Sequence, residues 1–261
     1  MWSRSMNQTI PTPPDWSDVR TFFMPPEAWK APYELDPAES HHLTRVLRIR
    51  EGEEIRVLDG KGREGIFRVV SCLRNKVRLE LIQDWNYPEP ESRIILAAGW
   101  TKAARRGWIL EKAVEFEAAG IWLWQAERSQ FPVPGDIKDS WQGQLIAGAK
   151  QCRNPWLPEL RTLPGGVAEL IRLVETFPDA TKHVLVESGY EAVISLTPSV
   201  LGKPGTTICV VGPEGGFTHQ EVEALCHAGF LPATLGERVL RWETAAMLCL
   251  GLHWWKRQLP E

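Results

Sequence analysis

The chain has 261 residues, enough for one large domain or for two modest ones that each have a hydrophobic core. Its apolar content of 43% and charged content of 24% are those of an ordinary globular protein. The formal net charge of -3 excludes a protein that coats nucleic acid through bulk charge, although a local basic patch remains compatible with it.

The cysteine and hydropathy patterns exclude further classes. The five cysteines form no CxxC pair and their number is odd, so we expect neither a metal centre nor a disulfide framework, and we expect a cytoplasmic location. The longest apolar run, 245–255, is too short and too interrupted to span a bilayer. The first residues lack the apolar segment of a signal peptide, so we expect no membrane partner.

The beginning of the chain predicts an arm and then a helix. Residues 1–20 carry three prolines and no hydrophobic periodicity, which is typical of a flexible arm. Asp36 can cap a helix whose first turn contains a proline and an acidic residue. We expect that helix to present Leu43, Val46 and Leu47 on one face.

A small β-rich unit should follow. Turn residues at Asp59-Gly60 and at Asn75 separate three short runs that alternate like strands, at 54–58, 65–70 and 76–82. Two prolines, Pro88 and Pro90, then predict a linker.

From Arg93 onward, strands should alternate with helices. The expected strands are 94–98, 121–124, 183–187 and 206–211, and the expected helices are 103–119, 136–151, 218–227 and 243–256. Alternation of this kind predicts an α/β domain with a mostly parallel sheet.

The sharpest motif is the glycine-rich turn at 212–216, which follows a buried strand. Three glycines let the backbone approach a ligand closely, and Thr218 with Glu221 forms a capping box that opens the next helix. The turn has neither the Lys-Ser/Thr of a P-loop nor GxGxxG spacing, and Glu214 disfavours a triphosphate. A cationic ligand such as a sulfonium fits better, although the same spacing also occurs in turns without ligands.

Two groups of charged residues accompany this turn. The loop 235–244 crowds two arginines, a glutamate and a threonine before an apolar helix, as a second pocket wall or a salt-bridged helix entrance would. Basic residues also gather at 41–78 and at 102–106, in the manner of a phosphate-binding surface or of a solvated face. His41 and His42 lack partners at ligand spacing, so we expect no metal there.

Together these segments resemble the 16S ribosomal RNA uracil-N3 methyltransferases, a branch of the knotted SPOUT methyltransferases. The residues that carry the resemblance are His42–Arg48 with Gly52 and Asp59-Gly60, then Lys102, Lys112, Glu115 and Glu127-Arg128-Ser129, then Gln151-Cys152-Arg153 with Pro158, Gly212–Gly216, and Leu235–Arg241 with Glu243–Ala245. The resemblance covers about residues 20 to 256, and its last two motifs are the most specific.

The resemblance implies a fold, a cofactor and partners. It implies a PUA-like RNA-binding β-barrel domain at 21–86 and a SPOUT α/β domain with a trefoil knot at 92–261, whereas the arm at 1–20 is extra to the family. It also implies a homodimer that uses S-adenosylmethionine to methylate 16S ribosomal RNA in the 30S subunit.

The resemblance and the motifs together suggest roles for particular residues. We expect the cofactor to contact Glu187, Gly212, Pro213, Glu214, Gly215, Gly216, Leu235, Gly236, Val239, Leu240 and Thr244. We expect RNA to contact Arg45, Arg48, Arg50, Lys102, Arg128 and Arg153.

Methylation of uracil N3 requires loss of the imide proton and stabilisation of negative charge on the uracil carbonyls. Arg241 and Arg153 are candidates for the second task, and Glu214, Glu243 or a water could accept the proton. The alternatives are a knotted methyltransferase that acts on a tRNA base or a ribose, an RNA-binding homologue without catalysis, and an unrelated nucleotide-binding α/β enzyme.

Overall fold

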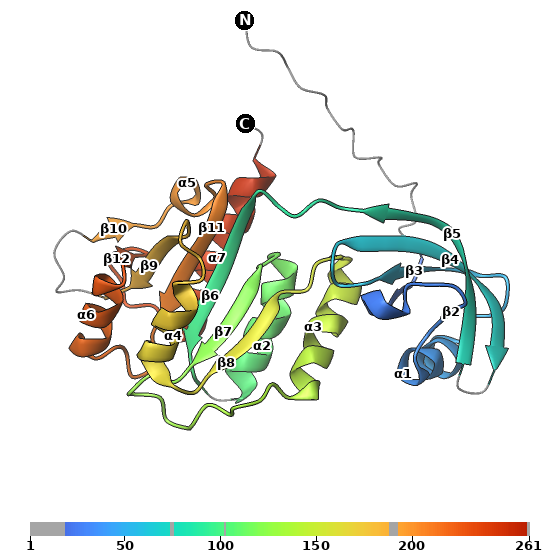
Figure 1. Ribbon diagram of the computed structural model, residues 1–261, viewed down its shortest axis with the longest axis horizontal. Helices are drawn as coiled ribbons and strands as arrows, with labels where there is room; N and C mark the ends of the chain where they lie inside the picture. The colour runs from blue at the N-terminus through green and yellow to red at the C-terminus, as the bar shows by residue number, and fades with distance from the viewer. Residues whose placement is uncertain (1–18, 74–75, 102, 188–192, 260–261) are drawn as a thin grey trace, which may run out of the picture.

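The computed structural model describes residues 19–73, 76–101, 103–187 and 193–259. Two sheets follow each other along the chain (Figure 1): a mixed five-stranded sheet and a parallel seven-stranded sheet. The predicted α/β fold, with a small β-rich unit before a parallel-sheet domain, is confirmed. Asn75 and nearly all of the expected arm lie outside the described residues.

The first sheet has the strand order β1-β3-β4-β5-β2. Its strands are β1 (Thr21–Phe23), β2 (Tyr33–Glu34), β3 (Glu54–Leu58), β4 (Arg63–Leu73) and β5 (Lys76–Asn86). Short helical segments connect them: η1 (Pro26–Ala28), α1 (Pro37–His41) and η2 (His42–Leu47). The long antiparallel strands β4 and β5 extend past the expected ends because their register shifts twice and the ladder resumes each time.

The predicted helix start at Asp36 is confirmed, since its carboxylate accepts a hydrogen bond of 2.8 Å from the Glu39 backbone N–H. The expected apolar face is only partly correct. Leu43 is fully buried, whereas Val46 is 58% exposed. The chain is π-helical from His42, and this wider turn breaks the three-to-four-residue spacing on which the expectation depended.

The second sheet is entirely parallel, in the order β10-β12-β9-β11-β6-β7-β8. Its strands are β6 (Ser92–Gly99), β7 (Gly120–Trp124), β8 (Glu159–Leu163), β9 (Thr181–Leu185), β10 (Ile194–Ser195), β11 (Gly205–Val211) and β12 (Leu231–Thr234). Its helices are α2 (Ala103–Glu115), α3 (Asp139–Cys152), α4 (Gly166–Val174), α5 (Pro198–Leu201), α6 (His219–His227) and α7 (Trp242–Gln258).

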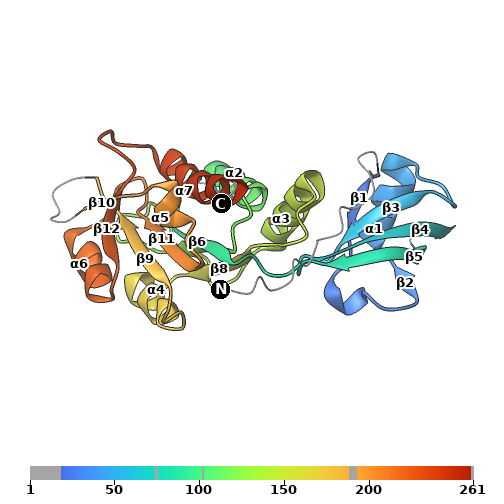
Figure 2. The same ribbon diagram turned by 90° about the horizontal axis from the view of Figure 1, so that it is seen from above.

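Helices cover both faces of this sheet, which explains the nearly continuous apolar strands. Alternate residues of β6 point to opposite sides: Ile94 and Leu96 join the core under α2, α3 and α7, while Ile95 and Ala97 join the core under α4 and α6. Figure 2 shows α2, α3 and α7 together on one side of the sheet and α4 on the other.

The last segment returns from the edge region of the sheet to its centre. After β12, which pairs with β9 and β10, the chain continues into α7, and α7 packs against the central strands β6 and β11. The predicted trefoil knot requires a return of this kind.

One helix boundary and several elements differ from expectation. The helix expected over 103–119 ends at Glu115, because Glu117 takes a left-handed backbone with φ of +54°. β8, α4, β10 and α5 were not predicted, although Val167, Leu170 and Val174 repeat at helical spacing within α4.

Backbone hydrogen bonds join the five-stranded sheet to the domain of the seven-stranded sheet. The Gly62 N–H donates to the Pro155 carbonyl at 2.9 Å, and the Leu157 N–H donates to the Gly60 carbonyl at 3.0 Å. A Cβ on Gly62 would lie 2.2 Å from an indole carbon of Trp156, so only glycine permits this approach.

Candidate functional site

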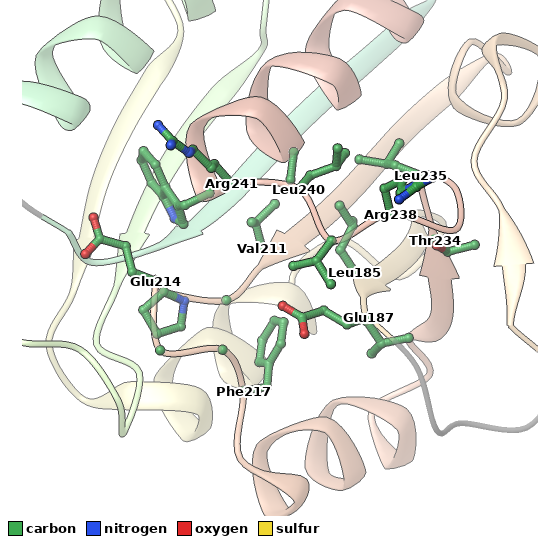
Figure 3. Close-up of a pocket in the computed structure, with 18 of the residues that line it drawn as sticks. Leu185, Glu187, Val211, Glu214, Phe217, Thr234, Leu235, Arg238, Leu240 and Arg241 are labelled. Atoms are coloured by element: carbon green, nitrogen blue, oxygen red, sulfur yellow. The ribbon is translucent and has the colours of Figure 1, made fainter.

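A cavity of about 890 Å³ opens beside the carboxyl ends of β9, β11 and β12, where ligands bind in open parallel sheets (Figure 3). Four segments line it: 185–187 after β9, 211–217 after β11, 234–241 after β12, and the first turn of α7. Arg128, from the loop after β7, and Val222, in α6, complete the wall.

The turn at 212–216 is held by the helix that follows it. Thr218 caps α6, and the capping box with Glu221 predicted from the sequence is confirmed. The Glu221 carboxylate is 1% exposed and also accepts a hydrogen bond of 2.9 Å from the Glu127 backbone N–H. Glu221 therefore ties the start of α6 to the loop after β7.

The end of β6 supports the same turn from below. A Cβ on Gly99 would lie 2.4 Å from the Pro213 backbone nitrogen, so glycine is required where the two backbones meet. Gly216 takes a φ of +71°, and a Cβ there would meet no atom within 4 Å. At Gly216 the turn thus presents backbone to open space.

Charged residues of both signs line the cavity. Figure 3 shows the Glu187 carboxylate near its middle, with Glu214 and Arg241 on one side and Arg238 on the other. The Glu214 carboxylate accepts a hydrogen bond of 2.7 Å from the Thr101 hydroxyl. The Glu187 carboxylate beside apolar walls suits a ligand that carries positive charge and an apolar ring.

The structure brings together nearly all of the residues expected to contact a cofactor. The lining residues among them are Glu187, Gly212, Pro213, Glu214, Gly215, Gly216, Leu235, Gly236, Val239 and Leu240. Thr244 lies in the first turn of α7, between the lining residues Trp242 and Ala245, but does not itself line the cavity.

The three arginines expected to contact uracil or RNA near the site fall in different places. Arg241, the N-cap of α7, lines the cavity. Arg128 lines it as well, and its guanidinium donates to the Gly215 carbonyl at 3.2 Å. Arg153 is exposed, ends α3 with a φ of +60°, and does not line the cavity.

Several lining residues were not expected: Leu185, Val211, Phe217, Thr234, Trp242 and Ala245. Phe217 stacks on Trp124 with ring centroids 5.8 Å apart and 23° between the planes. Its position directly after the last glycine of the motif was the available signal. Nothing comparable in the sequence marks Leu185, because it reads as an ordinary strand residue.

The basic cluster at 41–78 divides into two groups. Arg56, Arg63, Arg68, Lys76 and Arg78 all lie within 4 Å of carboxylates, for example Arg63 at 2.5 Å from Asp84. By contrast, Arg45, Arg48 and Arg50 are exposed, and no ion pair with another described residue involves them. Lys102 lies outside the described residues.

The described ranges contain neither a metal-binding cluster nor a membrane-spanning helix. No group of three or more His, Cys, Asp or Glu side chains there could hold a metal ion. No helix in the same ranges is long and apolar enough to cross a membrane.

Two family models match the chain. A model described as an RNA methyltransferase domain matches residues 88–254, and one described as an RNA methyltransferase PUA domain matches residues 35–82. Among curated proteins, the chain is 30% identical over 226 residues to ribosomal RNA small subunit methyltransferase E of Mycobacterium bovis, covering 83% of this chain and 84% of that protein. It is 27% identical to the protein of the same name from Bacillus subtilis, over 84% and 88%.

Solved structures agree with these matches. The ribosomal RNA small subunit methyltransferase E of Neisseria gonorrhoeae, bound to S-adenosylmethionine, superposes with a TM-score of 0.72 and 25% identity, covering 89% of this chain and 95% of that one. A Legionella pneumophila protein solved with the same cofactor gives a TM-score of 0.74 and 26% identity, covering 90% and 96%.

Proposed function

This chain belongs to the RNA methyltransferase family, and from that premise we propose that it methylates N3 of one specific uridine in 16S ribosomal RNA. It is an enzyme that uses S-adenosylmethionine to methylate small-subunit ribosomal RNA. The observation that carries the proposal is the cavity itself, which gathers the two most specific motifs of the sequence around one space.

The cavity fits S-adenosylmethionine. When bound, this cofactor supplies an activated methyl group on a sulfonium centre. The open space beside Gly216 and Gly236, where a Cβ would meet no atom within 4 Å, gives backbone groups access to a ligand. Leu185, Leu235 and Leu240 would contact the adenine, and the carboxylate of Glu187 would favour the positively charged parts.

The chain's own side chains would then act on the base. Arg241 would stabilise the negative charge that develops on the uracil carbonyls as N3 loses its proton. Glu214, at the cavity wall, or Glu243, in the first turn of α7, would accept that proton directly or through a water. A flipped or unpaired uridine is needed, because a paired N3 is not accessible.

The exposed Arg45, Arg48 and Arg50 support a role for the first unit in RNA binding. Cations that are not already paired with carboxylates remain available for phosphates. We assign residues 21–86 to an RNA-binding PUA-like domain and 92–261 to the methyltransferase domain. Lys102 and Arg153 would add phosphate contacts.

We also propose a homodimer. In one chain, α1 and the pocket strands β9 and β12 lie at opposite ends of the molecule (Figure 2). Apolar side chains remain exposed on α2 and α7, which pack together: Trp108 is 43% exposed, Leu248 36% and Trp255 53%. Val239, at the cavity rim, is 71% exposed. A second copy would cover these groups and could bring its Arg153 to the pocket.

The substrate places the enzyme in the cytoplasm, in ribosome biogenesis, with 16S ribosomal RNA within the 30S subunit as its partner. The alternatives are methylation of a tRNA base or a ribose, and RNA binding without catalysis. No metal is needed, because the sulfonium itself activates the methyl group.

One experiment separates these possibilities. The purified protein is incubated with labelled S-adenosylmethionine and either unmodified 30S subunits or free 16S RNA, and digested nucleosides are identified by mass spectrometry. We expect N3-methyluridine. Another methylated nucleoside would contradict the N3 assignment, and cofactor binding without transfer to either RNA would favour the non-catalytic alternative.

A further inference from the structure

An arginine outside the pocket is connected to its wall. Arg106, in the first turns of α2, packs its guanidinium carbon 3.9 Å from the ring centroid of Trp100 and 5.3 Å from that of Trp141. Both indoles are buried, at 5% and 7% exposure. Two aromatic faces therefore fix the plane of this guanidinium.

The Arg106 guanidinium, packed between the two indoles, also contacts the segment that follows β6. Its Nη1 donates a hydrogen bond to the Thr101 carbonyl. Thr101 is 4% exposed, and its hydroxyl donates to the Glu214 carboxylate at 2.7 Å. A continuous series of contacts thus runs from Trp141 on α3 to the glycine-rich turn.

The surroundings of Arg106 are unfavourable for the stability of the fold. Its Nε is buried without a hydrogen-bond partner among the described atoms, and burial lowers the pKa of the guanidinium. The cation also lies near the N-terminus of α2, where the helix dipole disfavours positive charge. An apolar residue would fill the space between the indoles without these costs.

We propose that Arg106 is a positioning residue for methyl transfer: held by Trp100 and Trp141, it fixes Thr101, whose hydroxyl orients the Glu214 carboxylate at the pocket. The inference rests on the proposed function, because it assigns Glu214 work in the reaction. Thr101 is nearly fully buried and holds its hydroxyl in place, so it offers a fixed donor to the exposed Glu214 carboxylate.

The test compares steady-state kinetics of variants on the RNA substrate. We expect Arg106→Ala and Thr101→Val each to lower kcat on the order of tenfold or more, because misplaced groups lose near-attack geometry. The Kd for S-adenosylmethionine should change less than about threefold, since the lining backbone is untouched. Thr101→Ser keeps the hydroxyl and should retain wild-type kcat.

The double variant gives the sharpest result. If Arg106 acts through Thr101, then adding Arg106→Ala to Thr101→Val lowers kcat no further. Lys138→Ala is the matched control, because Lys138 also lies over the Trp141 ring, at 5.9 Å, while no hydrogen bond or ion pair within the described residues joins it to Arg106, Thr101 or Glu214. Its kcat should be unchanged.

Each outcome separates the two proposals. A wild-type kcat in Thr101→Val, or multiplicative losses in the double variant, would overturn this inference while leaving the enzyme's function intact. If Arg106→Ala does not fold, the contrast between Thr101→Val and Thr101→Ser still decides. Absence of methyl transfer by the wild-type protein would overturn both proposals.

Discussion

On the inner face of α7, His253 is fully buried, and its Nε2 lies 3.1 Å from the Ser92 hydroxyl. Burial, and then the charge of Arg257, lower the pKa of this imidazole from 6.5 to about 4. The unfolded chain therefore binds this proton more tightly than the folded chain does. Above about pH 6.5, His253 is neutral in both states and does not lower the free energy of unfolding. As the pH drops to 4, protonation of the unfolded chain should lower that free energy by about 3 kcal/mol.

Urea unfolding between pH 7 and pH 4 checks this expectation. His253→Asn should remove most of the slope, and a smaller slope should remain because burial also lowers the pKa of His183. His227→Asn, on the exposed end of α6, is the control and should keep the wild-type slope. An unaltered slope in His253→Asn would assign the acid sensitivity to other groups.

Arg241 is expected to act on the uracil base. Arg241→Ala should lower kcat about 10²-fold, because it removes a donor aimed at developing charge. Isothermal titration should show nearly unchanged affinity for S-adenosylmethionine. Arg172→Ala, on the exposed side of α4, controls for loss of a surface arginine. Wild-type turnover in Arg241→Ala would remove it from the mechanism.

At the scale of elements, the glycine-rich turn depends on the strand beneath it. Gly99→Ala places a methyl group 2.4 Å from the Pro213 nitrogen, so the turn must move. We expect weaker cofactor binding and a loss of about 1–3 kcal/mol in unfolding free energy, measured by titration and urea unfolding. Gly143→Ala is the control: its Cβ meets no atom within 4 Å on an exposed turn of α3. It should gain about 0.5–1 kcal/mol and bind normally.

Contacts between residues close in sequence could be predicted, whereas contacts between distant segments could not. The capping box at Thr218 and the helix start at Asp36 were predictable, because their hydrogen bonds join residues three apart. The bond between Thr101 and Glu214 was not, because 113 residues separate its partners and only the folded sheet brings them together. The π-helical conformation of residues 42–47 could not be predicted for a different reason, because the apolar residues there fit an α-helix equally well.

For the whole molecule, the backbone contact between Gly62 and Pro155 fixes the first sheet against the second. In Gly62→Ala, the new Cβ would overlap Trp156, so the contact should open. The KM for RNA should rise several-fold or more, while cofactor affinity stays constant, because only the placement of the basic segment changes.

Gly52→Ala supplies the matched comparison. Gly52 has nearly the same φ, +89° against +91°, but a Cβ there meets no atom within 4 Å. Both variants carry the same backbone strain, so a difference in KM isolates the contact with Trp156. Equal KM values would show that the joint between the two sheets does not guide RNA.

The return of the chain from β12 to the centre of the sheet also determines when the cofactor site is completed during synthesis. β6 is synthesised long before β11, its central neighbour, and the segment 234–245 that closes the cavity comes later still. A nascent or truncated chain therefore has no complete cofactor site. Because a ligand stabilises only the state that binds it, cellular S-adenosylmethionine would protect finished molecules from proteolysis and leave unfinished ones exposed. The cofactor would thus mark completed synthesis before it serves as a methyl donor.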